Sequence, residues 1–371
     1  MRIEAGRHPI LMIPGPSEPY PEALHIASLK IFEHYGSRWL KIYNVFYEYS
    51  LKLFGAESGY VIPFPIPASF TMEVILNSLF DKESNILFIN DGFFVRRFKD
   101  IALRYGLSVH HVVPQSPGHR VDLDEVGLLM DAVDIEAVVV VHSETSQGIL
   151  EDLDGISNIV KDRAVLIVDS VSSYGALKID VIRRGIDICI GYSSKALGAL
   201  NGITPVYISE EIADKLRERK KYKAFLNDLK VWYEYREIWP FHPYPTSLPT
   251  HVILSFIKAA ENVLDEGLDK VERRHWDISR YVYRRLEEFG LEGYPEPSSR
   301  SPTVSVFKLN DVDADDIVDY LIKKYNILIG TSKFAGYNGI RIGHMGYTAN
   351  YRFVEPVISG VIEYLSNSSE Q

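Results

Sequence analysis

Apolar runs alternate with amphipathic stretches between residues 60 and 210 of the chain. The apolar runs have the length of strands and lie at 85–90, 107–113, 136–142, 164–169, 187–193 and 203–209. Helix-length stretches separate them at 94–106, 122–133 and 153–163. Near-continuous apolar strands that alternate with helices are typical of βαβ units, in which helices cover both faces of the sheet. The pattern therefore predicts an α/β domain.

The pattern changes after residue 210. An aromatic-rich polar segment at 230–251 interrupts the alternation, and we expect some of its exposed aromatic side chains around 232–244 at a subunit interface. The later stretches predict a smaller α+β domain, with helices at 268–290, about 313–325 and 350–366 and strands in "TVSVFKL" and "GIRIGHMG". We divide the chain into an N-terminal arm (1–16), a large domain (17–265) and a small C-terminal domain (266–371).

Composition and charge argue against several classes of partner. Fifty acidic and 40 basic residues give the 371-residue chain a net charge of −10, which repels phosphate backbones and anionic lipid. No apolar run approaches the roughly 18 to 20 residues of a spanning helix, and the N-terminus lacks the apolar core of a secretory signal. We therefore expect a cytoplasmic protein without nucleic-acid or membrane partners. The presence of only three glutamines in a charge-rich chain favours a thermophilic source.

Polar side chains follow several predicted strands at their carboxyl ends, where open α/β sheets bind ligands. Asp169 ends one strand, the run 142–146 follows another, and Lys195 follows a third among small residues. No carboxylate comes after Lys195 before Glu210. A lysine held in such a cleft loses its proton more easily than one in water, and the neutral amine can form a Schiff base. Two simpler readings stay open: Asp169 as a helix cap and Lys195 as a solvated surface charge.

Other chemistries lack their residues. The sequence contains no G-x-G-x-x-G, Walker loop, G-x-S-x-G elbow or H-E-x-x-H motif. His110 and His111 are adjacent on a predicted strand and point to opposite faces, so we expect no metal site. Cys189 is the only cysteine and lies within an apolar run, where a small buried hydrophobic side chain is expected.

Residues 138–209, from "VVVVHSETSQG" to "ITPVYIS", resemble the class V aminotransferases that use pyridoxal 5'-phosphate. The resemblance extends from "IPGPSEPYP" to "GIRIGHMGY" and is strongest to the serine–pyruvate and alanine–glyoxylate aminotransferases. It implies fold type I: a large cofactor-binding domain with a mostly parallel seven-stranded sheet between helices, and a smaller α+β C-terminal domain. It also implies a homodimer with shared active sites. The implied activity is ping-pong transfer of an amino group from serine or alanine to pyruvate or glyoxylate.

The resemblance also implies roles for individual residues around the cofactor ring. Lys195 matches the lysine that holds the cofactor as a Schiff base and later moves a proton. Asp169 matches the aspartate that bonds the pyridine nitrogen, and a protonated ring is the better electron sink. Val171 matches a residue packed under the ring, and Phe94 takes the place of a stacking aromatic. Thr145 matches the residue that bonds the phenolic oxygen.

The phosphate site departs from the pattern of the family, which has a turn rich in Gly and Ser before a helix. Here Pro67 removes one donor, while Ala68, Ser69 and Phe70 keep their N–H groups. Ser194 replaces a glutamine that is common in the nearest relatives. We interpret the anion site as retained but altered.

Three further residues match positions that bind the phosphate or the substrate. Tyr244 and Ser247 match a tyrosine and a threonine that reach the phosphate from the neighbouring subunit. Arg341 matches the arginine that clamps the substrate carboxylate, for which a planar guanidinium is suited. The simpler reading of Arg341 is a structural ion pair.

Three alternatives to an aminotransferase are considered. A lyase of the same fold is compatible with these residues, because the bond that is broken depends on substrate geometry. A cysteine desulfurase needs a mobile cysteine, and Cys189 lies within a predicted strand. A non-catalytic relative is suggested by the altered phosphate turn, but Lys195, Asp169 and Arg341 are all present.

Overall fold

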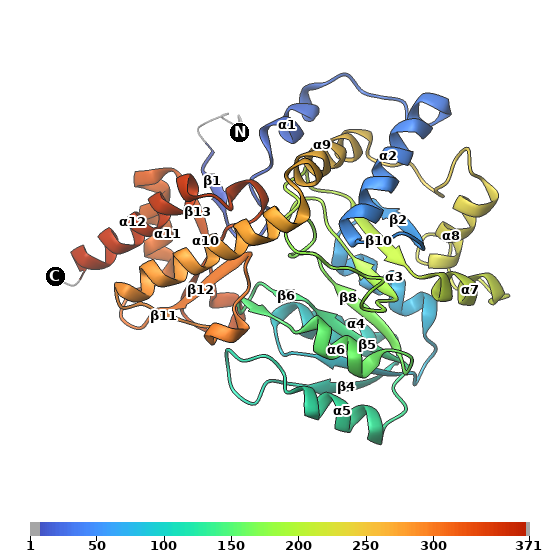
Figure 1. The fold of residues 1–371 in the computed structure, drawn as a ribbon, viewed down its shortest axis with the longest axis horizontal. Helices are drawn as coiled ribbons and strands as arrows, with labels where there is room; N and C mark the ends of the chain where they lie inside the picture. Colours follow the sequence, from blue (N-terminus) through green and yellow to red (C-terminus); the bar gives the residue numbers. More distant parts are fainter. Residues whose placement is uncertain (1–7, 369–371) are drawn as a thin grey trace.

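A seven-stranded sheet forms the centre of the larger part of the protein (Figure 1). The computed structural model describes residues 8–368. The strands are β2 (Tyr60–Phe64), β3 (Asn85–Ile89), β4 (Ser108–Val112), β5 (Ala137–Val141), β8 (Val165–Asp169), β9 (Ile188–Ile190) and β10 (Thr204–Ile208). Their order is β2-β10-β9-β8-β5-β3-β4, and β10 is antiparallel to both neighbours whereas the other pairs are parallel. The predicted mostly parallel α/β sheet is confirmed.

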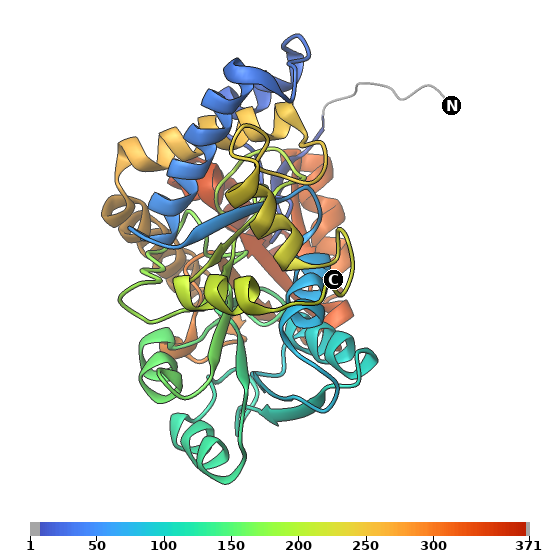
Figure 2. The same cartoon turned by 90° about the vertical axis from the view of Figure 1, so that its right-hand side faces the viewer.

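The central strands are buried on both faces, which explains their unbroken apolar sequence. Every residue of β5 and β9 is buried, and helices lie on both sides of the sheet (Figure 2). The helices of this part are α1 (Pro21–His25), α2 (Gly36–Phe54), α3 (Ala68–Leu79), α4 (Phe93–Arg104), α5 (Leu123–Ala132), α6 (Leu153–Val160), α7 (Glu210–Glu218), α8 (Leu229–Ile238) and α9 (Thr250–Glu266), with a 3-10 turn η1 (Ile26–Ser28).

A five-stranded sheet with the order β1-β13-β14-β12-β11 forms the smaller part. Its strands are β1 (Ile10–Met12), β11 (Glu292–Gly293), β12 (Val304–Lys308), β13 (Ile327–Thr331) and β14 (Gly339–Gly343). The accompanying helices are α10 (Leu268–Glu288), α11 (Ala314–Tyr325) and α12 (Tyr351–Ser368), with 3-10 turns η2 (Pro297–Ser299), η3 (Lys333–Ala335) and η4 (Gly346–Thr348). A short hairpin of β6 (Ser143–Glu144) and β7 (Ile149–Leu150) follows β5 in the larger part.

Strand β1 was not predicted from the sequence. It pairs in parallel with β13 through Ile10 and Ile327, so the N-terminal segment lies among the C-terminal elements (Figure 1). Three apolar residues are too few to give a recognisable strand pattern. Directly after β1 the chain reaches the large sheet, because the Ser17 amide donates to the Ser194 carbonyl at 2.9 Å. Residues 13–17 therefore bridge the two sheets.

The two parts of the protein have separate large hydrophobic cores. Helix α9 packs in the core of the large sheet, whereas the second half of α10 buries Ile278, Val282 and Leu286 in the core of the small sheet. The change of core therefore falls within α10. The division of the chain at residue 265 stays a prediction of the sequence.

The aromatic segment at 230–251 contains a helix, α8, which the sequence pattern did not predict. Asp228 caps its N-terminus by accepting from the Lys230 amide at 3.0 Å. Trp232 is buried against Phe64, with ring centroids 4.5 Å apart, so it is not among the exposed aromatic side chains of the segment. Exposed aromatic side chains of this segment occur further on, where Trp239 is 49% exposed.

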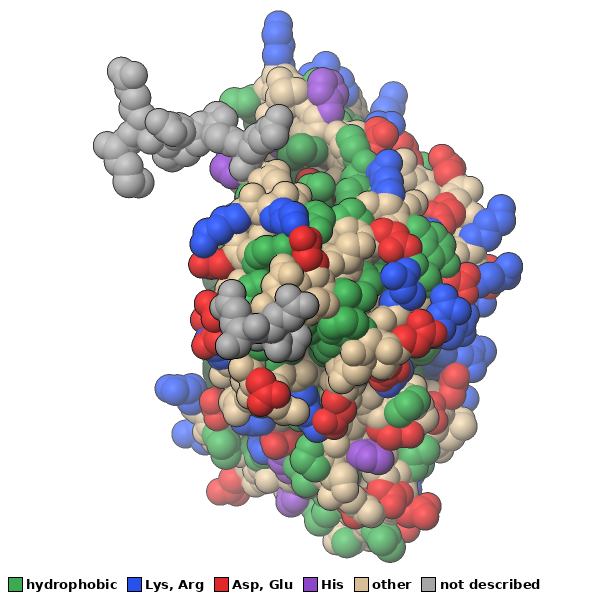
Figure 3. All heavy atoms as spheres, turned by 90° about the vertical axis from the view of Figure 1, so that its left-hand side faces the viewer, with side chains coloured by type: hydrophobic (Ala, Val, Ile, Leu, Met, Phe, Trp, Pro, Cys, Tyr) green, Lys and Arg blue, Asp and Glu red, His purple; other side chains and the backbone are tan. Residues whose placement is uncertain are grey.

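Acidic and basic side chains are interspersed on the face formed by the smaller part (Figure 3). Within residues 8–368, no helix combines the length and the apolar character needed to cross a bilayer.

Candidate active site

The carboxyl ends of three parallel strands bring the predicted polar residues to one edge of the large sheet. Asp169 ends β8 and is in register with Val141 of β5 on one side and Ile190 of β9 on the other. The segment 142–146 leaves β5 beside it, and the turn that carries Lys195 follows β9. The structure therefore places the candidate residues on adjacent strand ends, as the sequence predicted.

Lys195 lies in a tight turn and is half-buried. Its carbonyl accepts from the Gly198 amide at 2.9 Å, and its Nζ donates to the carbonyl of Pro14 at 2.5 Å. Burial lowers the pKa of the amine from 10.5 to about 8. The charge of Arg341 lowers this pKa further, whereas Asp169 and Glu144 oppose the shift. The simple reading of Lys195 as a solvated surface charge is therefore wrong.

The N-terminal segment 13–17 forms a wall of the site. The Ser17 hydroxyl donates to the Lys195 carbonyl at 2.5 Å, and a Cβ on Gly343 would meet the Ile13 carbonyl oxygen at 2.3 Å. Gly15 has a φ of +128°, and a Cβ on it would lie 2.1 Å from Lys195 Nζ. Only glycine leaves this space open for the lysine amine.

We expect Gly15→Ala to weaken cofactor binding at least about tenfold without unfolding the chain, because the added methyl group displaces the Lys195 amine. Gly290→Ala is the matched control: Gly290 has a φ of +108°, but a Cβ there would enter open space. Titration with the cofactor, followed by visible absorbance, measures the affinity of both variants. Thermal unfolding of both variants checks that they are folded. Equal cofactor affinity in the two variants would contradict it.

Asp169 caps a turn with one oxygen and leaves the other without a partner. Its Oδ1 accepts from the Val171 amide at 2.8 Å and so holds a turn, while Oδ2 has no hydrogen-bond partner among residues 8–368. The side chain is buried, and this burial raises the pKa of the carboxyl to about 7, against the effect of the Val171 amide. A cation placed against the second oxygen would favour the charged carboxylate. Val171 itself is half-buried beside it.

Glu144 is a buried carboxylate that the sequence reasoning missed. It is fully buried, accepts from the Phe94 amide at 3.1 Å, and accepts from the Ser146 amide at 2.9 Å and hydroxyl at 2.7 Å. Burial raises the pKa of its carboxyl, and the Ser146 hydrogen bonds oppose this. Glu144 thus caps α4 and fixes the backbone of Phe94, which is half-buried. Its position three residues after an apolar strand was the available signal.

Arg341 projects from β14 towards the large sheet. Its Nε donates to the Thr331 carbonyl at 2.9 Å, its Nη1 donates to the Thr145 carbonyl at 3.2 Å, and its Cζ lies 4.4 Å from the centre of the Phe334 ring. No carboxylate within the described part of the chain forms an ion pair with it, so the reading as a structural ion pair fails. Burial lowers the pKa of the guanidinium to about 10. The remaining N–H groups are available to a carboxylate.

The predicted phosphate turn lies at the start of α3, whose N-cap is Pro67. The Ala68 and Ser69 amides have no acceptor in the part of the chain that is described, as is usual for the first amides of a helix. The Phe70 amide donates to the Pro67 carbonyl at 3.0 Å. The first turn of the helix tightens onto this carbonyl, and contact of the Phe70 amide with a phosphate stays a prediction.

Three other predicted phosphate residues already have partners within their own chain. The Ser194 hydroxyl donates to Asn201 Oδ1 at 3.3 Å. Tyr244 is buried, where its hydroxyl donates to the His34 carbonyl at 2.6 Å and accepts from Trp39 Nε1 at 2.5 Å. Ser247 Oγ lies 3.2 Å from His34 Nε2. Contact of Tyr244 or Ser247 with the phosphate of a cofactor bound in a neighbouring subunit stays a prediction. Such a contact would require these side chains to give up their present hydrogen bonds.

Cys189 lies in β9 and is fully buried. Its thiol contacts the Ser170 hydroxyl at 3.3 Å, and burial raises its pKa to about 12. A buried thiol of this kind is a poor nucleophile. The prediction of a structural role for Cys189 agrees with this environment.

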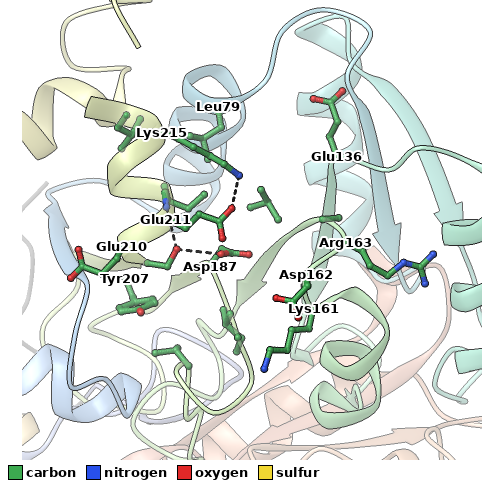
Figure 4. Close-up of a pocket in the computed structure, with 18 of the residues that line it drawn as sticks. Leu79, Glu136, Lys161, Asp162, Arg163, Asp187, Tyr207, Glu210, Glu211 and Lys215 are labelled. Atoms are coloured by element: carbon green, nitrogen blue, oxygen red, sulfur yellow. Dashed lines mark hydrogen bonds and ion pairs between the residues drawn. The ribbon is translucent and has the colours of Figure 1, made fainter. Parts of the chain in front are cut away.

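A separate cavity of about 970 Å³ lies at the opposite, amino edge of the large sheet (Figure 4). Two groups of its charged side chains already have partners: Asp187 accepts from the Ser209 hydroxyl at 3.2 Å, and Lys215 pairs with Glu211 at 2.9 Å. None of the predicted site residues lines this cavity.

The chain is similar to known aminotransferases over nearly its whole length. A sequence model of the family described as aminotransferase class-V matches residues 30–338. An uncharacterized aminotransferase of Methanocaldococcus jannaschii is 31% identical, covering 93% of this chain and 90% of that protein. Alanine–glyoxylate aminotransferase of Mus musculus is 27% identical, covering 96% and 88%. The crystal structure of ureidoglycine–glyoxylate aminotransferase from Bacillus subtilis superposes with a TM-score of 0.88 at 26% identity, covering 97% and 93%.

Proposed function

Because this chain belongs to the class V aminotransferases and takes pyridoxal 5'-phosphate as its cofactor, we propose that it transfers an amino group from a small L-amino acid to a small 2-oxo acid. The observation that carries the proposal is the convergence of Lys195, Asp169 and Arg341: the charges of the other two residues both act on the pKa of the Lys195 amine. Lys195, Asp169 and Arg341 therefore lie close enough for their charges to affect one another.

The residues around Lys195 fit this cofactor. Gly15 leaves room for the Lys195 amine, which a Cβ would displace, and Asp169 Oδ2 is free for a ring nitrogen. The Ala68 and Ser69 amides are free for an anion at the positive end of a helix. In the proposal Lys195 holds the cofactor covalently.

The division of labour among the residues follows from their environments. Bound pyridoxal phosphate supplies an electron sink that stabilises negative charge at the substrate Cα. With this electron sink in place, Lys195 Nζ would take the proton from the substrate Cα, and its lowered pKa suits this exchange near neutral pH. Arg341 binds the substrate carboxylate with the N–H groups that Thr331 and Thr145 do not use.

Further roles around the ring stay proposals. Phe94 and Val171 pack against the two ring faces, and Thr145 bonds the phenolic oxygen. Exposed apolar side chains at Ile238, Trp239 and Phe241 support a homodimer, because such a group is unusual on a free surface. We keep the cytoplasm as the proposed location.

Serine or alanine is the proposed amino donor, with pyruvate or glyoxylate as acceptor. Two of the similar proteins are named for glyoxylate, which supports a small 2-oxo acid. A panel of L-amino acids assayed with each acceptor tests the proposal. We expect alanine or serine to give the highest kcat/KM, and preference for a large or aromatic donor would contradict it. The alternative is a lyase of the same fold.

The pH dependence of cofactor capture follows from the Lys195 pKa. The folded state lowers this pKa from 10.5 to about 8, so the reactive neutral amine is half-populated near pH 8, predominates above it and is lost as the pH falls below it. We expect the rate of capture by cofactor-free protein to rise up to about pH 8 and then level off. Stopped-flow absorbance measures this rate. The same measurement on lysine with a blocked α-amino group, free in solution, corrects for the pH dependence of the cofactor itself. A rate that rises steadily to pH 10 would contradict the lowered pKa.

A further inference from the structure

Arg97 is a cation without a carboxylate partner. It extends from α4, and its Nη1 donates to the Ser69 hydroxyl at 3.1 Å. Its Cζ lies 4.8 Å from the centre of the Phe93 ring and 5.4 Å from that of Phe94. No ion pair with it occurs within residues 8–368, whereas the adjacent Arg96 pairs with Asp91 at 3.3 Å. Two aromatic rings and one neutral hydroxyl thus hold this guanidinium.

The position of Arg97 matters because Ser69 belongs to the proposed phosphate turn. A phosphate monoester carries about −1.5 to −2 charge at neutral pH, and a helix N-terminus offers roughly +0.5. The turn has lost further donors, since Pro67 has no N–H and the Phe70 amide bonds to the Pro67 carbonyl. The Ala68 and Ser69 amides therefore leave most of the phosphate charge uncompensated.

We propose that Arg97 is a cofactor-binding residue that contacts the phosphate of pyridoxal phosphate beside Ser69. The Ser69 hydroxyl accepts from Arg97, so its own hydrogen is free to donate to a phosphate oxygen. Phe93 and Phe94 hold the guanidinium at the turn, and its N–H groups beyond the one used by Ser69 remain free to bind the anion. The inference rests on the cofactor of the family and on the proposed phosphate site at α3.

The test compares pyridoxal phosphate with pyridoxal, which lacks only the phosphate. Arg97→Gln removes the charge, and Arg96→Gln is the matched control on the same helix. Affinities come from absorbance titration of cofactor-free full-length protein, with thermal unfolding as the check on folding. We expect Arg97→Gln to weaken pyridoxal phosphate about 10- to 100-fold and pyridoxal less than about twofold. Arg96→Gln should leave both affinities unchanged.

Two results would overturn the role of Arg97. Equal weakening of both compounds would mean that the arginine acts by supporting Phe94 rather than by binding phosphate. Unchanged affinities in Arg97→Gln would remove the role altogether. A wild-type protein that binds both compounds equally would instead overturn the phosphate site at α3, and with it this inference.

Discussion

Replacement of Lys195 with alanine is expected to lower kcat by at least about 10³-fold, because it removes both the nucleophile that holds the cofactor and the group that moves the proton. Steady-state rates with the preferred donor and acceptor measure the loss. The carbonyl of Pro14 loses the hydrogen bond that it accepts from Lys195 at 2.5 Å, but the turn keeps its backbone bond between Gly198 and Lys195. We therefore expect the variant to remain folded.

A small primary amine supplied in solution is the control for this variant. The space left by the lysine side chain admits such an amine, which can take the proton in its place, so part of the rate should return as its concentration rises. Retention of more than about a tenth of the wild-type rate would contradict the central role of Lys195.

Arg341→Lys is expected to lower kcat/KM for amino-acid donors about 100-fold, which corresponds to roughly 2.7 kcal/mol of transition-state binding. Lysine keeps the charge but lacks the planar fork that binds a carboxylate in two places, and it loses the bonds to Thr331 and Thr145. Kinetics with alanine measure the effect, and cofactor titration should show unchanged affinity.

A substrate without a carboxylate separates binding from structural damage in Arg341→Lys. Ethylamine differs from alanine only by that group, so the variant should lose its preference for alanine while its low rate with ethylamine stays the same. An equal loss with both amines would show that Arg341 supports the structure and does not clamp the substrate.

The large sheet was predictable because its central strands are buried on both faces. An unbroken apolar run such as residues 138–141, within a chain that alternates strands with helices, is typical of such a strand. Asp169 and Lys195 were predictable for a related reason: a charged residue at the end of such a run, or a few residues after it, lies at the edge of the sheet. Both features depend on local sequence, so local reasoning recovers them.

Other parts of the site depend on contacts between distant segments. Pro14 and Lys195 are 181 residues apart, and β1 is too short to show that the N-terminal segment joins the small sheet. Glu144 lies in a polar run of the sequence, as a surface carboxylate would. Only the fold buries it at the start of α4. Arg97 is an exposed helix residue, and its contact with Ser69 forms only because α3 lies beside α4.

The stoichiometry of the first half-reaction tests the proposed amino transfer most directly. Protein loaded with pyridoxal phosphate is mixed with alanine or serine and no acceptor, and the released 2-oxo acid and ammonia are quantified. We predict about one equivalent of the matching 2-oxo acid per chain, no ammonia, and formation of glycine when glyoxylate is then added. Continued release of pyruvate with ammonia over many turnovers would contradict an aminotransferase and identify a lyase.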